Sequence, residues 1–441
     1  MDEPLFDLPR AGLRFDADDE VLARAAWSRL AEPGDAVAGA LVDSLGPADA
    51  LRWLVDAAGA PERAEAVLRR IAGGRELGLG TVDGSPGLAE APGRLPEVST
   101  GAATGEGPAA GRAARGGAVG LLVAAVRRWA PRLERLDPEG ELAVLGRHGG
   151  TFLAPGDPRW PSSFDVLGAA APLCLWVRGD PDLARLARRS VSLVGSRACT
   201  DYGVRVARSL ARGLAERGFT LVSGGAAGID AEVHRGALVS GAPTVAFLAG
   251  GVDRLYPASS TDLLRRAAEE GGAVVSEAPP GSVPGKQRFL KRNRLIAALS
   301  SGTVVVEAAL RSGALSTANH AVRLLRPLGA VPGPVTSMAS AGCHELLRRG
   351  AAVCVTDAAE AAELVGDMGE AAPVRRGESR PGDDLDAASA AVLDALPVRK
   401  PAHERSIARV AGLAFADTTG ALGLLELLGL AEQRDGGWRR R

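Results

Sequence analysis

Short runs of apolar, largely β-branched residues recur through the second half of the chain. They lie at 191–195, 220–224, 244–250, 273–276, 303–308 and 329–333. Segments with the helical spacing of apolar positions separate these runs, at 203–217, 230–240, 260–271, 291–299, 315–325 and 344–349. Continuous apolar strands that alternate with amphipathic helices indicate a parallel sheet covered on both faces. The pattern therefore predicts an α/β fold, with a Rossmann-like, doubly wound and mainly parallel sheet over residues 190–366.

Helical spacing also marks the part of the chain that precedes this sheet. Residues 1–72 carry the pattern of short helices, and a helical pattern resumes over 118–189, which continues as a connector with one predicted edge strand, PLCLWVRG. Between them, residues 73–117 are rich in Gly, Pro and Ala and have almost no periodic apolar positions. Such a segment cannot bury enough surface to offset the entropy of ordering it, so it is predicted to be a disordered insertion.

The C-terminal region shows a third pattern. A polar linker is predicted at 367–385, and a small domain follows at 386–441. In that domain, ASAAVLDAL, ERSIARVAG and TTGALGLLELLGL have the apolar spacing of three helices, and a hairpin with Gly436–Gly437 at its turn comes after them. Three helices followed by a hairpin suggest a winged helix.

Composition and charge exclude several classes of protein. The chain has 52 Lys and Arg against 53 Asp and Glu, so any site for a polyanion must be a local patch. Its four cysteines form no CxxC pair and its histidines lack zinc-ligand spacing, so we expect no metal site. The N-terminus does not have the pattern of a signal peptide, and no run of 18 apolar residues occurs. We therefore expect a cytoplasmic protein without a membrane span.

The loops that follow the predicted strands are the candidate functional site, because ligands of doubly wound sheets bind beyond the carboxyl ends of the strands. One loop carries Gly195, Ser196 and Arg197 before a helix, an arrangement suited to a phosphate group. The next carries Gly224 and Gly225 in a turn that nearly matches the dinucleotide fingerprint but lacks its first glycine. Taken alone, each loop is also compatible with a tight structural turn.

The segment GKQRFLKRNRLIAALSS at 285–301 concentrates positive charge. Two of the three lysines of the chain fall here, and no acidic residue lies between the first and last cation. Phosphates attract cations and an unpaired base can stack on an aromatic ring, so the segment favours single-stranded nucleic acid over duplex. A solvated helix face would give the same charge pattern by itself, and the phenylalanine could instead belong to the core. The candidate contacts are Lys286, Arg288, Phe289, Lys291, Arg292, Asn293 and Arg294.

As a set, several segments resemble the DprA/Smf family of DNA-processing proteins. They are VGSRACTDYG, SGGAAGIDAEVH, GGVDRLYP, SEAPPG, FLKRNRLIAALSS, VVVEAALRSGALSTA and VPGP. The resemblance implies a non-catalytic protein with no cofactor that binds and protects incoming single-stranded DNA through its Rossmann-like domain. It also implies homodimers, loading of RecA recombinase during natural transformation, exchange with single-strand-binding protein, and a SAM-like N-terminal domain. The DNA pocket of the family corresponds to Gly195, Ser196, Arg197, Gly224 and 286–294.

Two other functions remain open from the residues. A related Rossmann-like group hydrolyses nucleotide N-glycosidic bonds, and SSGTVVVEAALRSG is faintly similar to its motif but lacks the paired glycines. The C-terminal domain could alternatively act as a duplex-binding regulator. Its third predicted helix, however, has no Arg or Lys to reach a groove, so we expect this domain to contact proteins.

Overall fold

The computed structural model describes residues 13–59, 120–366 and 385–441. It divides into two compact units, one that ends at Ala372 and one that begins at Pro373. The predicted insertion at 73–117 and nearly all of the predicted linker at 367–385 lie outside the described residues.

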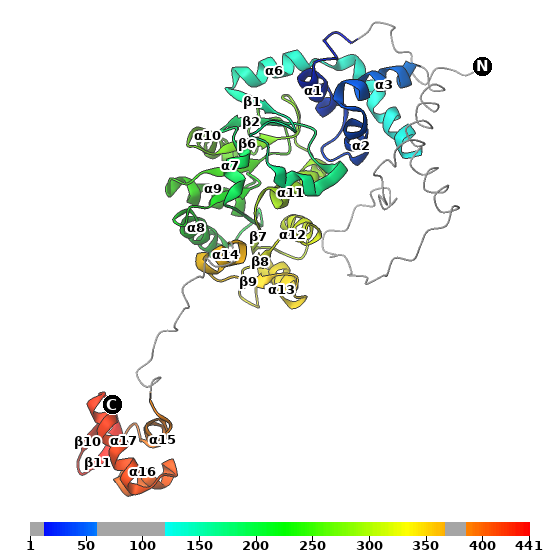
Figure 1. The fold of residues 1–441 in the computed structure, drawn as a ribbon. Helices are drawn as coiled ribbons and strands as arrows, with labels where there is room; N and C mark the ends of the chain where they lie inside the picture. Colours follow the sequence, from blue (N-terminus) through cyan, green and yellow to red (C-terminus); the bar gives the residue numbers. More distant parts are fainter. Residues whose placement is uncertain (1–12, 60–119, 367–384) are drawn as a thin grey trace, which may run out of the picture. The chain divides into compact units, whose positions relative to one another are not determined.

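A nine-stranded sheet forms the centre of the first unit, in the order β1-β2-β6-β5-β4-β3-β7-β8-β9 (Figure 1). The predicted apolar runs form β3 (Ser190–Gly195), β4 (Thr220–Ser223), β5 (Thr244–Phe247), β6 (Ala273–Ser276), β7 (Thr303–Glu307) and β8 (Leu328–Ala330). All of these strands pair in parallel with one another, as does β9 (Val353–Cys354) with β8. The prediction of a mainly parallel sheet is confirmed.

The sheet begins earlier in the chain than predicted. β1 (Gly150–Leu153) and β2 (Leu175–Gly179) pair antiparallel with each other, and β2 pairs antiparallel with β6. The predicted strand PLCLWVRG forms β2, but it lies between β1 and β6, so the prediction that it is an edge strand is wrong. β1 is hard to recognise in the sequence because its first three residues are only half-buried and give no continuous apolar run.

Helices cover both faces of the sheet, as the doubly wound prediction requires. Neighbouring residues of β3 show this: Val194 packs in a cluster with residues of α11 and α12, whereas Leu193 packs in another with residues of α8 and α9. The helices around the sheet are α7 (Leu183–Arg188), α8 (Asp201–Ala215), α9 (Ile229–Val239), α10 (Thr261–Glu269), α11 (Lys286–Leu299), α12 (Ala314–Arg323), α13 (Ala341–Arg348) and α14 (Ala358–Val365). Short 3-10 turns occur at Ser162–Ala170, Ala258–Ser260 and Met338–Ser340.

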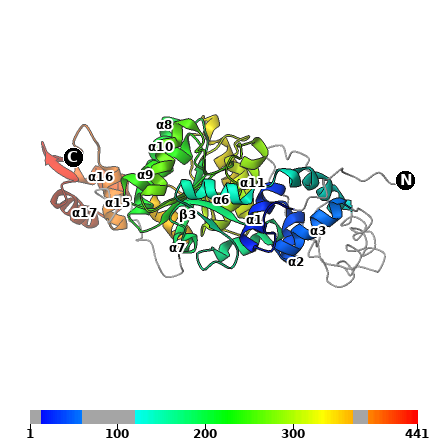
Figure 2. The ribbon, with the colours of Figure 1, turned by 90° about the horizontal axis from the view of Figure 1, so that it is seen from above.

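The N-terminal helices form their own core beside α11 (Figure 2). They are α1 (Glu20–Leu30), α2 (Ala36–Leu45), α3 (Pro47–Gly59), the helical stretch 120–129 and a 3-10 turn at Ala130–Arg135. Leu145 of the next helix, α6 (Pro138–Arg147), instead packs in a cluster with residues of the sheet. Asp19 and Asp35 cap α1 and α2 by accepting hydrogen bonds from the first free backbone N–H groups. At the centre of this core, Trp27 and Trp129 meet edge to face with their ring centroids 5.2 Å apart.

The second unit contains the predicted three helices and hairpin. They are α15 (Ala387–Ala395), α16 (Glu404–Ala411), α17 (Phe415–Leu427), β10 (Ala431–Arg434) and β11 (Gly437–Arg440). Asp435 and Gly436 hold positive φ at the turn, one residue earlier than predicted, as a two-residue hairpin turn requires. Among the described residues, no single helix has the length and apolar character to cross a membrane, although the bent pair α16 and α17 together meets that test.

Candidate functional site

The glycine turns after β3 and β4 pack backbone against backbone. The N–H of Ile229 donates to the carbonyl of Ser196 over 3.1 Å. Gly228 has a φ of 85°, and a Cβ on it would lie 2.4 Å from the carbonyl oxygens of Ser196 and Arg197. A side chain at this position would clash with backbone that cannot move away, and the φ also favours glycine. The turn that carries Arg197 is therefore held in one place by the start of α9.

Arg292 lies beneath the second glycine turn rather than at the surface. Its side chain is buried and donates hydrogen bonds to the carbonyls of Gly224 and Phe247, at the ends of β4 and β5. A Cβ on Gly224 would lie 2.6 Å from both Arg292 and Asp230. Burial lowers the pKa of Arg292 to about 10, against the opposing effect of Asp230. Arg292 therefore positions the ends of two strands.

Two further predicted contact residues also belong to the interior. Arg294 is buried and forms an ion pair with buried Glu277, in which Nη1 lies 2.7 Å from Oε2. Asn293 is buried and donates to the carbonyl of Gly313 over 3.3 Å. Three of the predicted contact residues, Arg292, Asn293 and Arg294, are therefore buried rather than exposed to an external ligand. The cause is the position of α11, whose second half is buried by α12, the sheet and the turn at 162–170.

The first turns of α11 do present the predicted cations. Lys286 and Lys291 are exposed, and within the described parts of the chain neither forms an ion pair. Arg197 reaches across from the loop after β3, with its guanidinium carbon 4.5 Å from the ring centroid of Phe289. The structure thus joins a predicted residue of the first loop to the predicted aromatic of α11, although these residues are far apart in sequence.

Arg288 has an acidic partner from the N-terminal helices. Glu32, in the turn between α1 and α2, accepts from Nε of Arg288 over 2.8 Å and from Nη2 over 3.2 Å. The hydrogen bond from Arg288 holds the pKa of Glu32 below its usual value, with a further contribution from Arg132. From α1, Arg29 also donates to the carbonyl of Pro280, just before α11, over 2.7 Å. The N-terminal helices are therefore fastened to the segment that begins the cationic helix.

Tyr256 is a candidate residue that the sequence did not single out. It follows β5 in the loop GGVDRLYP, its side chain is 50% exposed, and its ring centroid lies 6.2 Å from that of Phe289. The available signal was an aromatic residue in a loop after a predicted strand. The pattern alone gave no reason to prefer this aromatic over any other surface residue.

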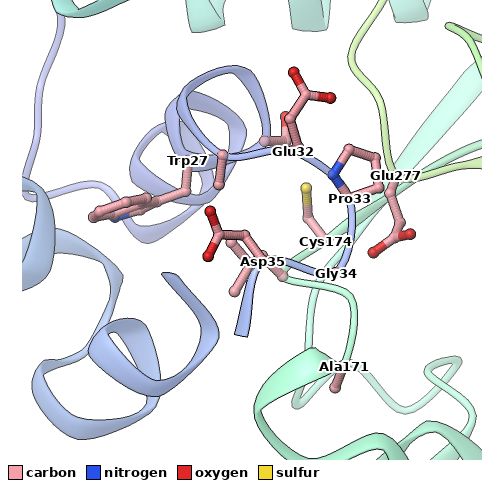
Figure 3. Close-up of a pocket in the computed structure, with 11 residues that line it drawn as sticks. Trp27, Glu32, Pro33, Gly34, Asp35, Ala171, Cys174 and Glu277 are labelled. Carbon is pink, nitrogen blue, oxygen red and sulfur yellow. The ribbon is translucent and has the colours of Figure 1, made fainter. Parts of the chain in front are cut away.

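A shallow pocket separates the N-terminal helices from the sheet (Figure 3). Its polar lining includes Glu32, Asp35 and Glu277, and each of these carboxylates already has an arginine partner. The described part of the chain has no group of three His, Cys, Asp or Glu side chains suited to a metal ion. The pocket therefore lies where the N-terminal helices pack against the rest of the unit. The candidate site lies instead around Arg197, Phe289 and the exposed lysines.

Comparison with known proteins gives a consistent set of relatives. A family model described as DNA recombination-mediator protein A matches residues 151–366, from the first strand of the sheet to the end of α14. DNA processing protein DprA of Mycobacterium tuberculosis is 50% identical over 312 residues, which is 68% of this chain and 79% of the relative. Protein Smf of Synechocystis is 32% identical over 320 residues, 65% of this chain and 78% of the relative. The structure of DNA processing protein A from Helicobacter pylori, described for its single-stranded DNA binding mode, matches 48% of this chain and 94% of its own with 30% identity and a TM-score of 0.44.

Proposed function

The chain belongs to the DprA/Smf family of DNA-processing proteins, and from that premise we propose that it binds single-stranded DNA at the carboxyl edge of its sheet. The observation that carries the proposal is the approach of Arg197 to Phe289, with exposed lysines on the same helix as the ring. Cations along a path attract a phosphate backbone, and neighbouring rings accept the faces of unpaired bases. A duplex hides those faces, so the site favours a single strand.

The proposed interface keeps the exposed and turn residues of the predicted set. It consists of Gly195, Ser196, Arg197, Gly224, Gly225, Lys286, Arg288, Phe289 and Lys291, with Tyr256 added. Arg292 supports this interface through its hydrogen bonds to the carbonyls of Gly224 and Phe247.

A non-catalytic role is proposed for the chain. The hydrolase alternative draws on the segment that contains Glu307, and this carboxylate is buried at the end of β7. Its oxygens accept hydrogen bonds from the backbone N–H and the hydroxyl of Thr200, over 2.8 and 2.6 Å, where they fix the start of α8. A carboxylate with these partners is poorly placed for attack on a glycosidic bond. The release of free base from nucleoside monophosphates would instead support the hydrolase.

The family also supports proposals about partners. We propose that the protein acts in the cytoplasm as a homodimer, loads RecA recombinase onto single strands in transformation and recombination, and exchanges DNA with single-strand-binding protein. The N-terminal helices would be the SAM-like domain. The three helices and hairpin of the second unit would be the winged helix, in which Trp438 also bridges to Ala402. Since α17 has no Lys or Arg, this unit would contact proteins.

The first prediction compares a poly-dT oligonucleotide with a duplex of equal length. In gel shifts at two salt concentrations, we expect tighter binding of poly-dT and weaker binding of both at high salt, because cations and stacking rings act together only on the unpaired strand. A chain that ends before residue 386 should keep the affinity for poly-dT. Equal affinity for the two nucleic acids at both salt concentrations would contradict the proposed function.

The second prediction concerns the acidic partner of Arg288. Glu32→Gln should raise the affinity for oligo-dT by up to about fivefold, since a half-exposed ion pair that competes with phosphate is worth about 0.2–1 kcal/mol. Because the pKa of Glu32 is lowered, the ion pair is present at neutral pH and is lost only as the pH falls through that lowered value, so the anisotropy titration belongs at neutral pH.

Glu216→Gln supplies the matched control for this charge change. Glu216 caps the far end of α8, its side chain is exposed, and it pairs with Arg212 on the same helix. The two variants change the net charge equally. If Glu216→Gln raises the affinity as much as Glu32→Gln, the effect is one of net charge alone and Glu32 does not compete for Arg288.

A further inference from the structure

An arginine of the N-terminal helices lies directly beside the cations of α11. Glu32, in the turn between α1 and α2, accepts hydrogen bonds from both sides. Its Oε1 accepts from Nη2 of Arg132 over 3.1 Å and from Nη2 of Arg288 over 3.2 Å. Since the two guanidinium groups bind the same oxygen, Arg132 and Arg288 are neighbours, although they belong to different helical segments.

The same turn binds a second arginine of the N-terminal helices. Asp35 pairs with Arg128, whose Nη2 lies 3.2 Å from Oδ2 of the carboxylate. Figure 3 shows Glu32 and Asp35 on this turn. Arg127, next to Arg128, is exposed and forms no ion pair with any residue that the structure describes. Residues Arg127, Arg128 and Arg132 are called the arginine row below.

The arginine row keeps an excess of positive charge. Together with Arg288 it has four guanidinium groups, whereas Glu32 and Asp35 supply two carboxylates. The side chains of Arg128 and Arg132 remain 54% and 39% exposed, and ion pairs at such exposure contribute little stability. Phosphates can therefore replace the carboxylates as partners of these arginines.

The neighbouring side chains make the row suited to a phosphate backbone rather than to bases. The single aromatic residue of the segment 120–135 is Trp129, and it is buried in the N-terminal core. No ring in this described segment is therefore available for stacking. A surface with exposed guanidinium groups and no exposed ring binds phosphates without regard to the base sequence.

We propose that the arginine row is a second phosphate-binding surface, along which a single strand continues after it leaves the edge of the sheet. The inference rests on the proposed function and adds the N-terminal helices to the nucleic-acid interface. A nucleic acid is favoured over an acidic protein because the row adjoins Arg288. A strand bound at the start of α11 reaches the row with the same backbone, whereas an acidic protein would need a separate reason to bind there.

The test compares two lengths of oligo-dT: about 6 nucleotides, near the lower end of single-strand site sizes, and about 30 nucleotides, well above their upper end. The double variant Arg127→Ala/Arg128→Ala should make the slope of log K against log salt shallower by about 1.4 on the long strand, because each phosphate contact contributes about 0.7. The slope on the short strand should stay unchanged, since the edge of the sheet accommodates that strand alone. Asp35 keeps its hydrogen bonds from the N–H groups of Val37 and Ala38 in this variant, so its carboxylate is not left without donors.

Arg188→Ala/Arg217→Ala is the matched control for this loss of charge. Both side chains are exposed, and they precede β3 and β4, at the opposite edge of the sheet from the proposed site. The control removes the same charge as the row variant. It should leave the slope unchanged on both strands, because it removes no phosphate contact.

Thermal melts of the full chain accompany the titrations. If the double variant does not fold, Arg127→Ala removes no ion pair and should make the slope on the long strand shallower by about 0.7. The inference is overturned if the row variant keeps the slope of the unmodified protein on the long strand, or if it changes the slope equally on both strands. An equal change in the control also overturns it, and all of these results leave the proposed function intact. An unmodified protein that binds neither strand would overturn the proposed function as well.

Discussion

Replacing Arg294 with methionine is expected to lower the free energy of unfolding by about 3–5 kcal/mol, the cost of leaving a buried charge without its partner. The side chains of Arg294 and Glu277 are only 5% and 7% exposed. Both nitrogens at the end of the guanidinium donate to the two carboxylate oxygens of Glu277, and Nε donates to the carbonyl of Ala170 over 2.9 Å. Methionine fills a similar volume but provides none of these donors.

Chemical denaturation measures the effect, and Arg288→Met is the matched control on the same helix. Arg288 also pairs with a glutamate, but the pair with Glu32 is half-exposed, so its loss should cost at most about 1 kcal/mol. Replacing both Glu277 and Arg294 with methionine should recover much of the lost stability, since no charge then remains buried. Equal destabilisation by Arg294→Met and Arg288→Met would show that the buried pair contributes no more than the exposed one.

Most of the strands that the sequence revealed are buried on both faces. In β3 through β8 nearly every residue is buried, so each strand appears in the sequence as a run of largely apolar residues. The strands at the margins lack this signal. β9 has two residues, both exposed, and β1 is partly exposed over most of its length. An edge strand buries at most one of its faces, so its pattern of apolar residues is weak. The local sequence therefore does not distinguish it from a loop.

The candidate site was predictable where the chemistry is local and not where it depends on distant partners. The glycine turns, Arg197 and the lysines of α11 follow from strand ends and charge. The burial of Arg294 depends on Glu277, which follows a different strand, and spacing along one helix contains no information about that partner. The sequence also placed the start of α11 at 291 instead of Lys286, which hid how a helix could be exposed at its first turns and buried at its last.

Replacing Lys286 and Lys291 together with alanine is expected to reduce the salt dependence of single-strand binding. Both side chains are exposed at the start of α11, and neither has an ion pair within the described residues. Each phosphate contact contributes about 0.7 to the slope of log K against log salt on a single strand, so the slope should become shallower by about 1.4. The affinity deficit of the variant should therefore shrink by about 25-fold when the salt concentration is raised tenfold.

The smaller affinity deficit at high salt distinguishes the loss of phosphate contacts from the loss of folding. A variant that is partly unfolded binds less at every salt concentration and keeps its slope, which is the result expected for Arg294→Met. Lys400→Ala, which removes the remaining lysine of the chain in the second unit, should leave both the affinity and the slope unchanged. If the double lysine variant keeps the slope of the unmodified protein, its lysines do not contact phosphates, and the strand must follow another path across the sheet edge.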